Sequence, residues 1–151
     1  MRFQKSLLSI LLLSLFLTGC LGKQGVVNKL NGQLNVFGVE LFSDVDYRQI
    51  HGVAATEEPC LKGYERSFDA LDVSIGYGFD KTIRKITTRN ASTSLFGITP
   101  GIPYQEGKEK ILQAGFREDV PPFKYKANGY TLKFLVDGNA TIFGLTLESI
   151  D

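Results

Sequence analysis

The stretch "PFKYKANGYTLKFLV", residues 122–136, carries the clearest structural signal in the chain. Its dipeptide Asn128-Gly129 is the strongest short-range signal for a tight β-hairpin. After this dipeptide, every second residue is apolar: Tyr130, Leu132, Phe134 and Val136. Alternation with a period of two is typical of a strand that has one buried face. The stretch therefore predicts two paired strands, with Lys124 and Lys126 on the outer face.

The residues on either side extend this hairpin. The turn signal "DGN" at 137–139 leads into a third predicted strand, "TIFGLTLE" at 141–148. Upstream, "PYQEGKEKILQAG" at 103–115 predicts a helix, because a proline suits its first position and a glycine suits the position after its end. Residues 94–150 thus predict one helix followed by three strands.

An internal repeat carries the same pattern into the first half of the chain. The tripeptide "FGV" at 37–39 returns as "FGI" at 96–98, an offset of 59 residues. At this offset and without gaps, the apolar positions of "LDVSIGYGF" (71–79) fall on those of the strand that begins at Tyr130. The alternative is a chance agreement between two alternating segments.

The first half follows the pattern more loosely. Asp44 can cap a short helix over residues 45–51. The alternating stretch 71–79 predicts a strand that pairs with "TIRKITTR" at 82–89, and the polar stretch 88–94 predicts a link to the second half.

The two halves, about 35–89 and 94–150, together predict a single domain over residues 35–151. The predicted fold class is α+β: two tandem α-β-β-β units that form an antiparallel sheet with the helices on one face.

The beginning of the chain is of a different kind. Arg2 and Lys5 precede a run that is apolar from Leu7 to Leu17 except for two serines, eleven residues in all. At about 1.5 Å per residue, this run spans only roughly half of a ~30 Å hydrocarbon layer. Its length and its cationic start predict a secretory signal peptide. The alternative is an uncleaved membrane anchor.

The end of that run resembles the lipobox of bacterial lipoproteins, an aliphatic residue and two small residues before a cysteine: Leu17, Thr18, Gly19 and Cys20. The resemblance implies that residues 1–19 are removed as a signal peptide and that Cys20 is lipidated. Residues 20–34 would then be a lipidated tether, and the protein would face the extracytoplasmic side of a membrane in the cell envelope. The alternative is an ordinary signal peptide whose cleavage site happens to hold a cysteine.

The remainder resembles small envelope proteins typified by the β-lactamase-inhibitor-protein fold and the SmpA/OmlA lipoproteins. The lead-in "GITPGIPYQE" carries the resemblance through Gly97, Ile98, Gly101 and Glu106, whereas Pro103 replaces the usual Ser or Thr. In the first half, Phe42 stands where Gly101 does in the second. The resemblance implies binding to another protein, as an inhibitor or assembly factor, without catalysis.

The net charge and the residue types present limit the functions that the sequence supports. Without Arg2 and Lys5, 15 basic residues stand against 16 acidic ones, so no cationic excess favours nucleic acid. Lipidation of Cys20 would leave Cys60 without a partner, and we expect Cys60 to be buried and inert rather than a site of intermolecular pairing. No motif for a catalytic site, a metal or a cofactor occurs, and His51 is the only histidine.

The leading hypothesis is a lipid-anchored, non-enzymatic envelope protein that binds an envelope or secreted protein. Its candidate binding face is Ser74, Gly76 and Gly78, because small side chains on one face of a strand leave the backbone approachable. One alternative is a small hydrolase that acts on the cell wall or a secreted substrate through His51. Another is a structural spacer with no specific ligand.

Overall fold

The computed structural model describes residues 24–120 and 122–150. The predicted signal peptide and the lipobox residues Leu17, Thr18, Gly19 and Cys20 lie outside the described residues. The chain divides into two units, Met1–Gly32 and Gln33–Asp151. In the first unit, residues 24–31 form a helix, within the stretch that we expected to be a tether.

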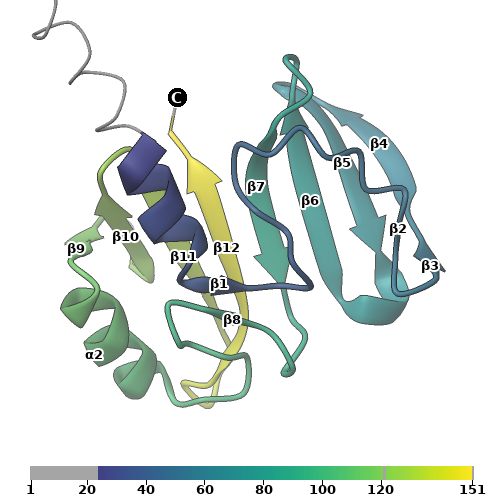
Figure 1. Ribbon diagram of the computed structural model, residues 1–151. Helices are drawn as coiled ribbons and strands as arrows, with labels where there is room; N and C mark the ends of the chain where they lie inside the picture. The colour runs from purple at the N-terminus through teal and green to yellow at the C-terminus, as the bar shows by residue number, and fades with distance from the viewer. Residues whose placement is uncertain (1–23, 121, 151) are drawn as a thin grey trace, which may run out of the picture. The chain divides into compact units, whose positions relative to one another are not determined.

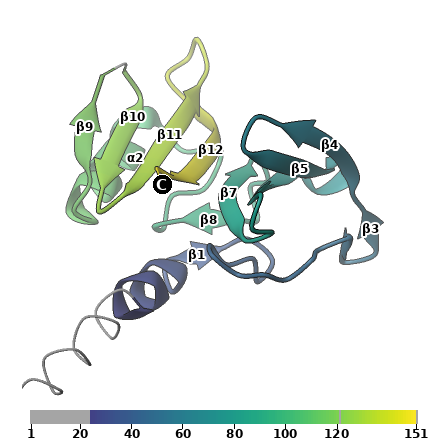
Figure 2. The same ribbon diagram turned by 90° about the horizontal axis from the view of Figure 1, so that it is seen from above.

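An eight-stranded antiparallel sheet forms the centre of the second unit, and its strands can be followed in Figures 1 and 2. From edge to edge, the strands are β4 (Thr56–Cys60), β5 (Gly63–Phe68), β6 (Val73–Gly78), β7 (Ile83–Thr88), β12 (Ile142–Ser149), β11 (Tyr130–Val136), β10 (Lys124–Ala127) and β9 (Arg117–Asp119). The remaining elements are the strand pairs β1 (Leu34–Asn35) with β8 (Ser94–Leu95) and β2 (Gln49–Ile50) with β3 (Val53–Ala54), the 3-10 turn η1 (Asp69–Leu71) and the helix α2 (Tyr104–Gln113). The hairpin predicted at Asn128-Gly129 is confirmed as β10–β11, and the helix predicted after Pro103 is confirmed as α2.

The predicted fold class is wrong, because the protein is mainly β and is not built from two α-β-β-β units. The predicted helix over residues 45–51 does not form. Its place is taken by an irregular segment and the hairpin β2–β3, in which His51 and Gly52 have φ angles of 47° and 78°. A segment of this length is too short to be stable as a helix without support from tertiary packing.

Side chains from the sheet hold this irregular segment in place. Arg66 on β5 has only 5% of its side chain exposed, and it forms ion pairs with Asp46 and Glu57. It also donates a hydrogen bond of 3.0 Å to the carbonyl oxygen of Tyr47. The hydroxyl of Tyr77 on β6 accepts a 3.1 Å hydrogen bond from the Tyr47 N–H and donates one of 3.1 Å to the Val45 carbonyl. These bonds fix the backbone of residues 45–47 in a non-helical path.

The two halves meet at the centre of the sheet, where β7 pairs with β12. Thr87 and Thr146, which are 59 residues apart, lie directly opposite each other, and their hydroxyl oxygens are 3.1 Å apart. Asn35 and Ser94, also separated by that spacing, lie opposite each other in the β1–β8 pair. An approximate two-fold axis of the backbone therefore passes between Thr87 and Thr146.

Backbone details repeat across this axis. The register shift between Gly76 and Tyr77 recurs between Leu135 and Val136. Likewise, the Phe42 N–H bonds the Ile83 carbonyl and, 59 residues later, the Gly101 N–H bonds the Ile142 carbonyl. The offset thus relates the strands of the two halves, whereas α2 has no counterpart in the first half.

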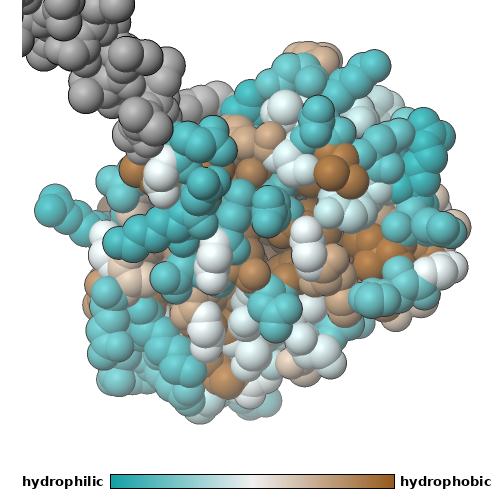
Figure 3. All heavy atoms as spheres, viewed as in Figure 1, coloured by the Kyte–Doolittle hydropathy of each residue, from teal (hydrophilic) through white to brown (hydrophobic). Residues whose placement is uncertain are grey.

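The core lies on the face of the sheet that α2 and the segment around Tyr47 cover. The most deeply buried side chains of the sheet on this face include Ile75, Tyr77, Ile86, Tyr125, Leu132, Phe134, Leu145 and Leu147. In the view of Figure 3, hydrophilic residues cover most of the visible surface, and hydrophobic residues show between them. Within the described residues, no helix has the length and apolar character needed to cross a membrane.

Candidate functional site

The other face of the sheet, which we call the open face, is covered neither by α2 nor by the segment around Tyr47. Its central feature is a row of hydroxyl side chains, each directly opposite the next on neighbouring strands: Thr56, Ser67, Ser74, Thr87 and Thr146. We call these five residues the hydroxyl row. The row continues through Lys133 on β11 to Lys124 on β10. Ser74, a predicted site residue, therefore belongs to a band of polar groups that crosses most of the sheet.

The predicted site residue Gly76 lies between two charged residues of the open face. Its cross-strand neighbours are Glu65 on β5 and Lys85 on β7, and these two side chains form an ion pair with each other. A Cβ atom at Gly76 would lie 3.0 Å from the Lys85 Cβ. The missing side chain thus lets Glu65 and Lys85 meet across β6.

This geometry corrects the expectation that the glycine backbone is approachable. Gly76 and Gly78 are both buried. Lys85 and Glu65 lie closest to Gly76, and Asp80 and Arg84 lie closest to Gly78. Any partner of this face therefore meets charged side chains above β6, and the backbone of the two glycines lies beneath them.

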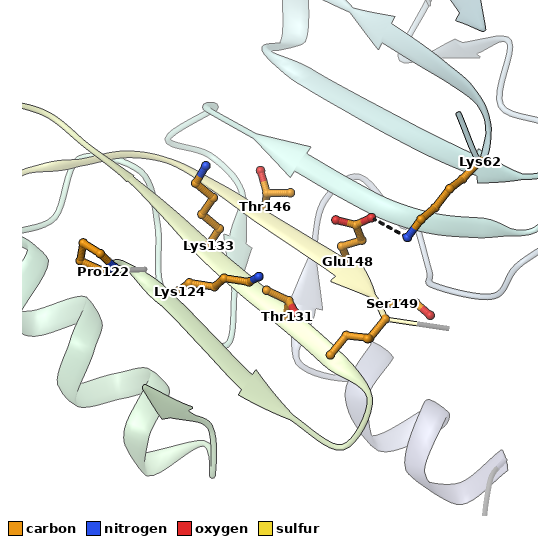
Figure 4. Close-up of a pocket in the computed structure, with 9 residues that line it drawn as sticks. Lys62, Pro122, Lys124, Thr131, Lys133, Thr146, Glu148 and Ser149 are labelled. Atoms are coloured by element: carbon orange, nitrogen blue, oxygen red, sulfur yellow. Dashed lines mark ion pairs between the residues drawn. The ribbon is translucent and has the colours of Figure 1, made fainter. Parts of the chain in front are cut away.

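The open face is concave. Lys62 lies in the turn between β4 and β5, yet its Nζ is 3.7 Å from the Glu148 carboxylate on β12, as Figure 4 shows. Three strand spacings of about 4.8 Å separate β5 from β12 along the sheet. This contact between a hairpin turn and a strand three positions away fits a sheet that curls toward the open face.

Three hollows lie side by side on the open face. One of about 370 Å³, drawn in Figure 4, is lined by Lys62, Lys124, Thr131, Lys133, Thr146 and Glu148, among others. A larger one of about 750 Å³ is lined by residues that include Leu61, Gly76, Gly78 and Phe79, and a third of about 390 Å³ by residues that include Ser67, Ser74 and Thr87. The first two hollows share Lys62 and Glu148, and the last two share Glu65 and Lys85. Together they form one continuous concave surface.

Like charges face each other toward both edges of this surface. Glu58 on β4 is directly opposite Glu65 on β5, and Lys124 on β10 is directly opposite Lys133 on β11. Such pairs destabilise a sheet. Lys85 offsets the charge of Glu65, and Lys124 lies 3.8 Å from Asp119, but in the described part of the chain neither Glu58 nor Lys133 has an ion-pair partner. The open face is thus acidic toward β4 and basic toward β10.

The basic side extends to the sheet edge. Lys126 and Arg117 are directly opposite each other on β10 and β9. Both lie on the open face, as Lys124 does, because Lys126 is two residues after Lys124 in the same strand. Asp119 is the acidic residue among them, and its carboxylate is 2.9 Å from the Lys126 ammonium. This ammonium, more than that of Lys124, holds the pKa of Asp119 below its ordinary value.

Stability is expected to fall in acid, because several carboxylates have lowered pKa values in the folded protein. Hydrogen bonds from Arg84 and then Thr82 lower the pKa of Asp80 to about 2, and Arg66 lowers the pKa of Asp46. In the unfolded chain these groups take up protons near the ordinary value of 3.8. Their contribution to stability is therefore complete above that value and is lost as the pH falls toward 2.

Thermal unfolding followed by circular dichroism would measure this effect. We expect a Tm that is steady between about pH 5 and 7 and decreases below about pH 4. An Asp80→Asn variant should lose less Tm over the acid range than the parent does. A parent Tm that stays constant down to pH 2 would contradict the assignment of these shifts.

Two residues singled out in the sequence lie away from the hydroxyl row. His51 is in the turn between β2 and β3, with its ring centroid 5.2 Å from that of Phe37, and it lines none of the three hollows. Cys60 is exposed at the end of edge strand β4, so the expectation that it is buried is wrong. Within residues 24–120 and 122–150, no group of three or more His, Cys, Asp or Glu side chains is placed to hold a metal ion.

Sequence reasoning found part of the open face. The alternation in "FKYK" correctly placed Tyr125 inside and Lys124 outside. It did not find the Lys124–Lys133 or Glu58–Glu65 pairs, because direct opposition depends on the register of two strands. The Asn128-Gly129 turn does set the register of β10 against β11, so the lysine pair could have been found from that signal.

Comparison of the chain with protein-family models, with curated proteins and with solved structures finds no match.

Proposed function

We propose that this chain is a lipid-anchored protein of the cell envelope that binds another protein across its open face, without catalysing a reaction. The observation that carries the proposal is the charge on that face, where two like-charged pairs, Glu58 with Glu65 and Lys124 with Lys133, lie toward opposite edges of the sheet. The proposed anchor is Cys20, in the lipobox formed with Leu17, Thr18 and Gly19.

The charge pattern favours a partner of complementary charge. Opposed like charges reduce the stability of the free protein, and a partner with acidic groups over Lys124 and Lys133 would relieve that repulsion. The same partner would place basic groups over Glu58. The hydroxyl row between the two regions can donate and accept hydrogen bonds, as the polar part of an interface requires.

The size of the face favours a protein over a small molecule. Glu58 on β4 and Lys124 on β10 are six strand spacings apart, roughly 29 Å along the sheet. A ligand that contacts both charged regions must reach across the concave face between them. A typical protein–protein interface buries about 800 Å² on each partner, which a face of this extent can supply.

The alternatives receive less support. The hydrolase alternative depended on His51, which lies in the β2–β3 turn and not in the hollows of the open face. The spacer alternative does not explain the opposed like charges, which lower the stability of the folded protein. Partner binding gives these charges a role.

A double variant, Lys124→Ala with Lys133→Ala, tests the proposed role of the basic region. We expect its free energy of unfolding to stay equal to that of the parent or to rise by a few tenths of a kcal/mol, because a repulsive pair is removed. In-cell crosslinking followed by mass spectrometry should identify the partner that is crosslinked to the parent. The yield of the same crosslink should be about tenfold lower for the double variant.

The matched control is Lys108→Ala with Lys110→Ala, which removes the same charge from α2 on the covered side of the sheet. The ion pairs of these lysines join half-buried lysine side chains to Glu118 and Glu106, which are exposed, and pairs near the surface contribute little to stability. This control should crosslink as the parent does. An undiminished crosslink in the Lys124/Lys133 variant would remove the open face from consideration. The anchor is tested separately, because a Cys20→Ser variant should leave the membrane fraction.

A further inference from the structure

Two hairpin turns at one end of the sheet carry exposed apolar side chains. The conformation of these turns does not require apolar residues. Residues Leu61 and Lys62 form the two-residue connection between β4 and β5, because Cys60 pairs with Gly63. Asn, Asp and Gly are the residues that such a turn favours. The chain instead places a leucine there with 98% of its surface exposed.

The neighbouring turn, between β6 and β7, has the same character. Phe79 follows the last residue of β6 and is 82% exposed. Gly63 is directly opposite Gly78, so the two turns extend from the same end of adjacent hairpins, and Leu61 and Phe79 line the same hollow. Ile150, which is 48% exposed, follows β12 at this end, and its N–H bonds the carbonyl of Gly129 in the β10–β11 turn.

Cationic residues accompany the exposed apolar ones. Lys62 directly follows Leu61, and Lys81 lies two residues after Phe79. The Lys62 side chain is 70% exposed, and its ammonium lies 3.7 Å from the Glu148 carboxylate. Lys81 is exposed and has no ion-pair partner in the ranges that the structure describes.

We infer that this end of the sheet docks onto a phospholipid bilayer, with Leu61 and Phe79 inserted among the lipids and Lys62 and Lys81 near the phosphates. Side chains that protrude from turns suit the fluid boundary of a bilayer, where apolar groups enter the acyl region and cations meet anionic headgroups. This contact is distinct from the proposed lipid anchor. It lies at one end of the open face, where Leu61 and Phe79 line the larger hollow. It would give the protein a defined orientation on the membrane.

The absence of tryptophan from the chain makes a direct test possible. A Phe79→Trp variant of the lipidated protein, reconstituted in vesicles of phosphatidylcholine and phosphatidylglycerol, carries one tryptophan at the proposed contact. We expect a blue shift of its emission, and loss of intensity when brominated lipids replace ordinary ones. Both effects should be weaker in vesicles of phosphatidylcholine alone.

Val120→Trp is the matched control. Val120 is 88% exposed, and it follows β9 beyond Asp119, in the direction away from the Leu61 turn. Its tryptophan should remain unshifted and unquenched in the same vesicles. Equal emission and equal quenching of the two variants would overturn the docking proposal. This is also the result expected if the two turns bind a protein and not lipid. Both variants are compared in the vesicle-bound fraction, so that failure of the anchor is seen separately as a loss of association.

Discussion

Replacing Gly63 by alanine is expected to destabilise the protein by more than about 3 kcal/mol, the largest single effect that the structure predicts. A Cβ atom at this position would lie 2.0 Å from the carbonyl oxygen of Tyr77 and 2.9 Å from the carbonyl carbon of Gly78. Both atoms belong to the backbone of β6, which is paired on both sides and cannot move aside. The φ angle of Gly63, +151°, is also one that L-residues rarely adopt.

Urea denaturation of the Gly63→Ala variant would measure this loss as a lower midpoint. Gly129→Ala is the control, because Gly129 also has a positive φ of 83°, but a Cβ atom there would meet no neighbouring group within 4 Å. This control should lose only about 1–2 kcal/mol, the cost of the left-handed backbone conformation alone. Equal losses in the two variants would show that the close approach of β5 to β6 is not what requires a glycine.

Replacing Gly107 by leucine is expected to cost about 3 kcal/mol, because helix α2 touches the sheet at this residue. A Cβ atom there would lie 2.3 Å from Ile142 Cδ1, with Ile98 and Phe134 within 3.6 Å. None of these three side chains is more than 1% exposed, so none has space into which to move. A larger side chain must therefore lift the helix from the sheet.

Glu109→Leu on the same helix is the control, because Glu109 is exposed and tolerates a leucine without repacking. Its free energy of unfolding should stay within about 0.5 kcal/mol of the parent value. Thermal unfolding of both variants by circular dichroism would separate the cases. A Gly107→Leu variant as stable as the Glu109→Leu variant would contradict the close packing of α2.

Local signals predicted the second half of the chain well. The Asn128-Gly129 turn and the alternation after it correspond to β10–β11, and the glycine after the helix is Gly115, with a φ of 91°. Gly107 is locally unfavourable within α2, because glycine is a poor helix former. The contact with Ile142 explains its presence, and that contact depends on residues far away in the sequence.

The first half shows why the helix prediction over residues 45–51 was wrong. The helix prediction includes Asp46, but the Asp46 carboxylate forms an ion pair with Arg66, a residue 20 positions later. The backbone of Tyr47 is bonded to Tyr77, 30 positions later. Neither partner is visible in the local pattern of residues 45–51.

The candidate site, too, could be predicted only in part from the sequence. Alternation along β6 was enough to place Ser74, Gly76 and Gly78 on one face, because side-chain direction within a strand follows from its period of two. The ion pair that covers Gly76, the hydroxyl row and the opposed like charges all arise from strand register and from the pairing of β7 with β12. Strand order and the curl of the sheet depend on contacts between residues distant in sequence, which no local periodicity encodes.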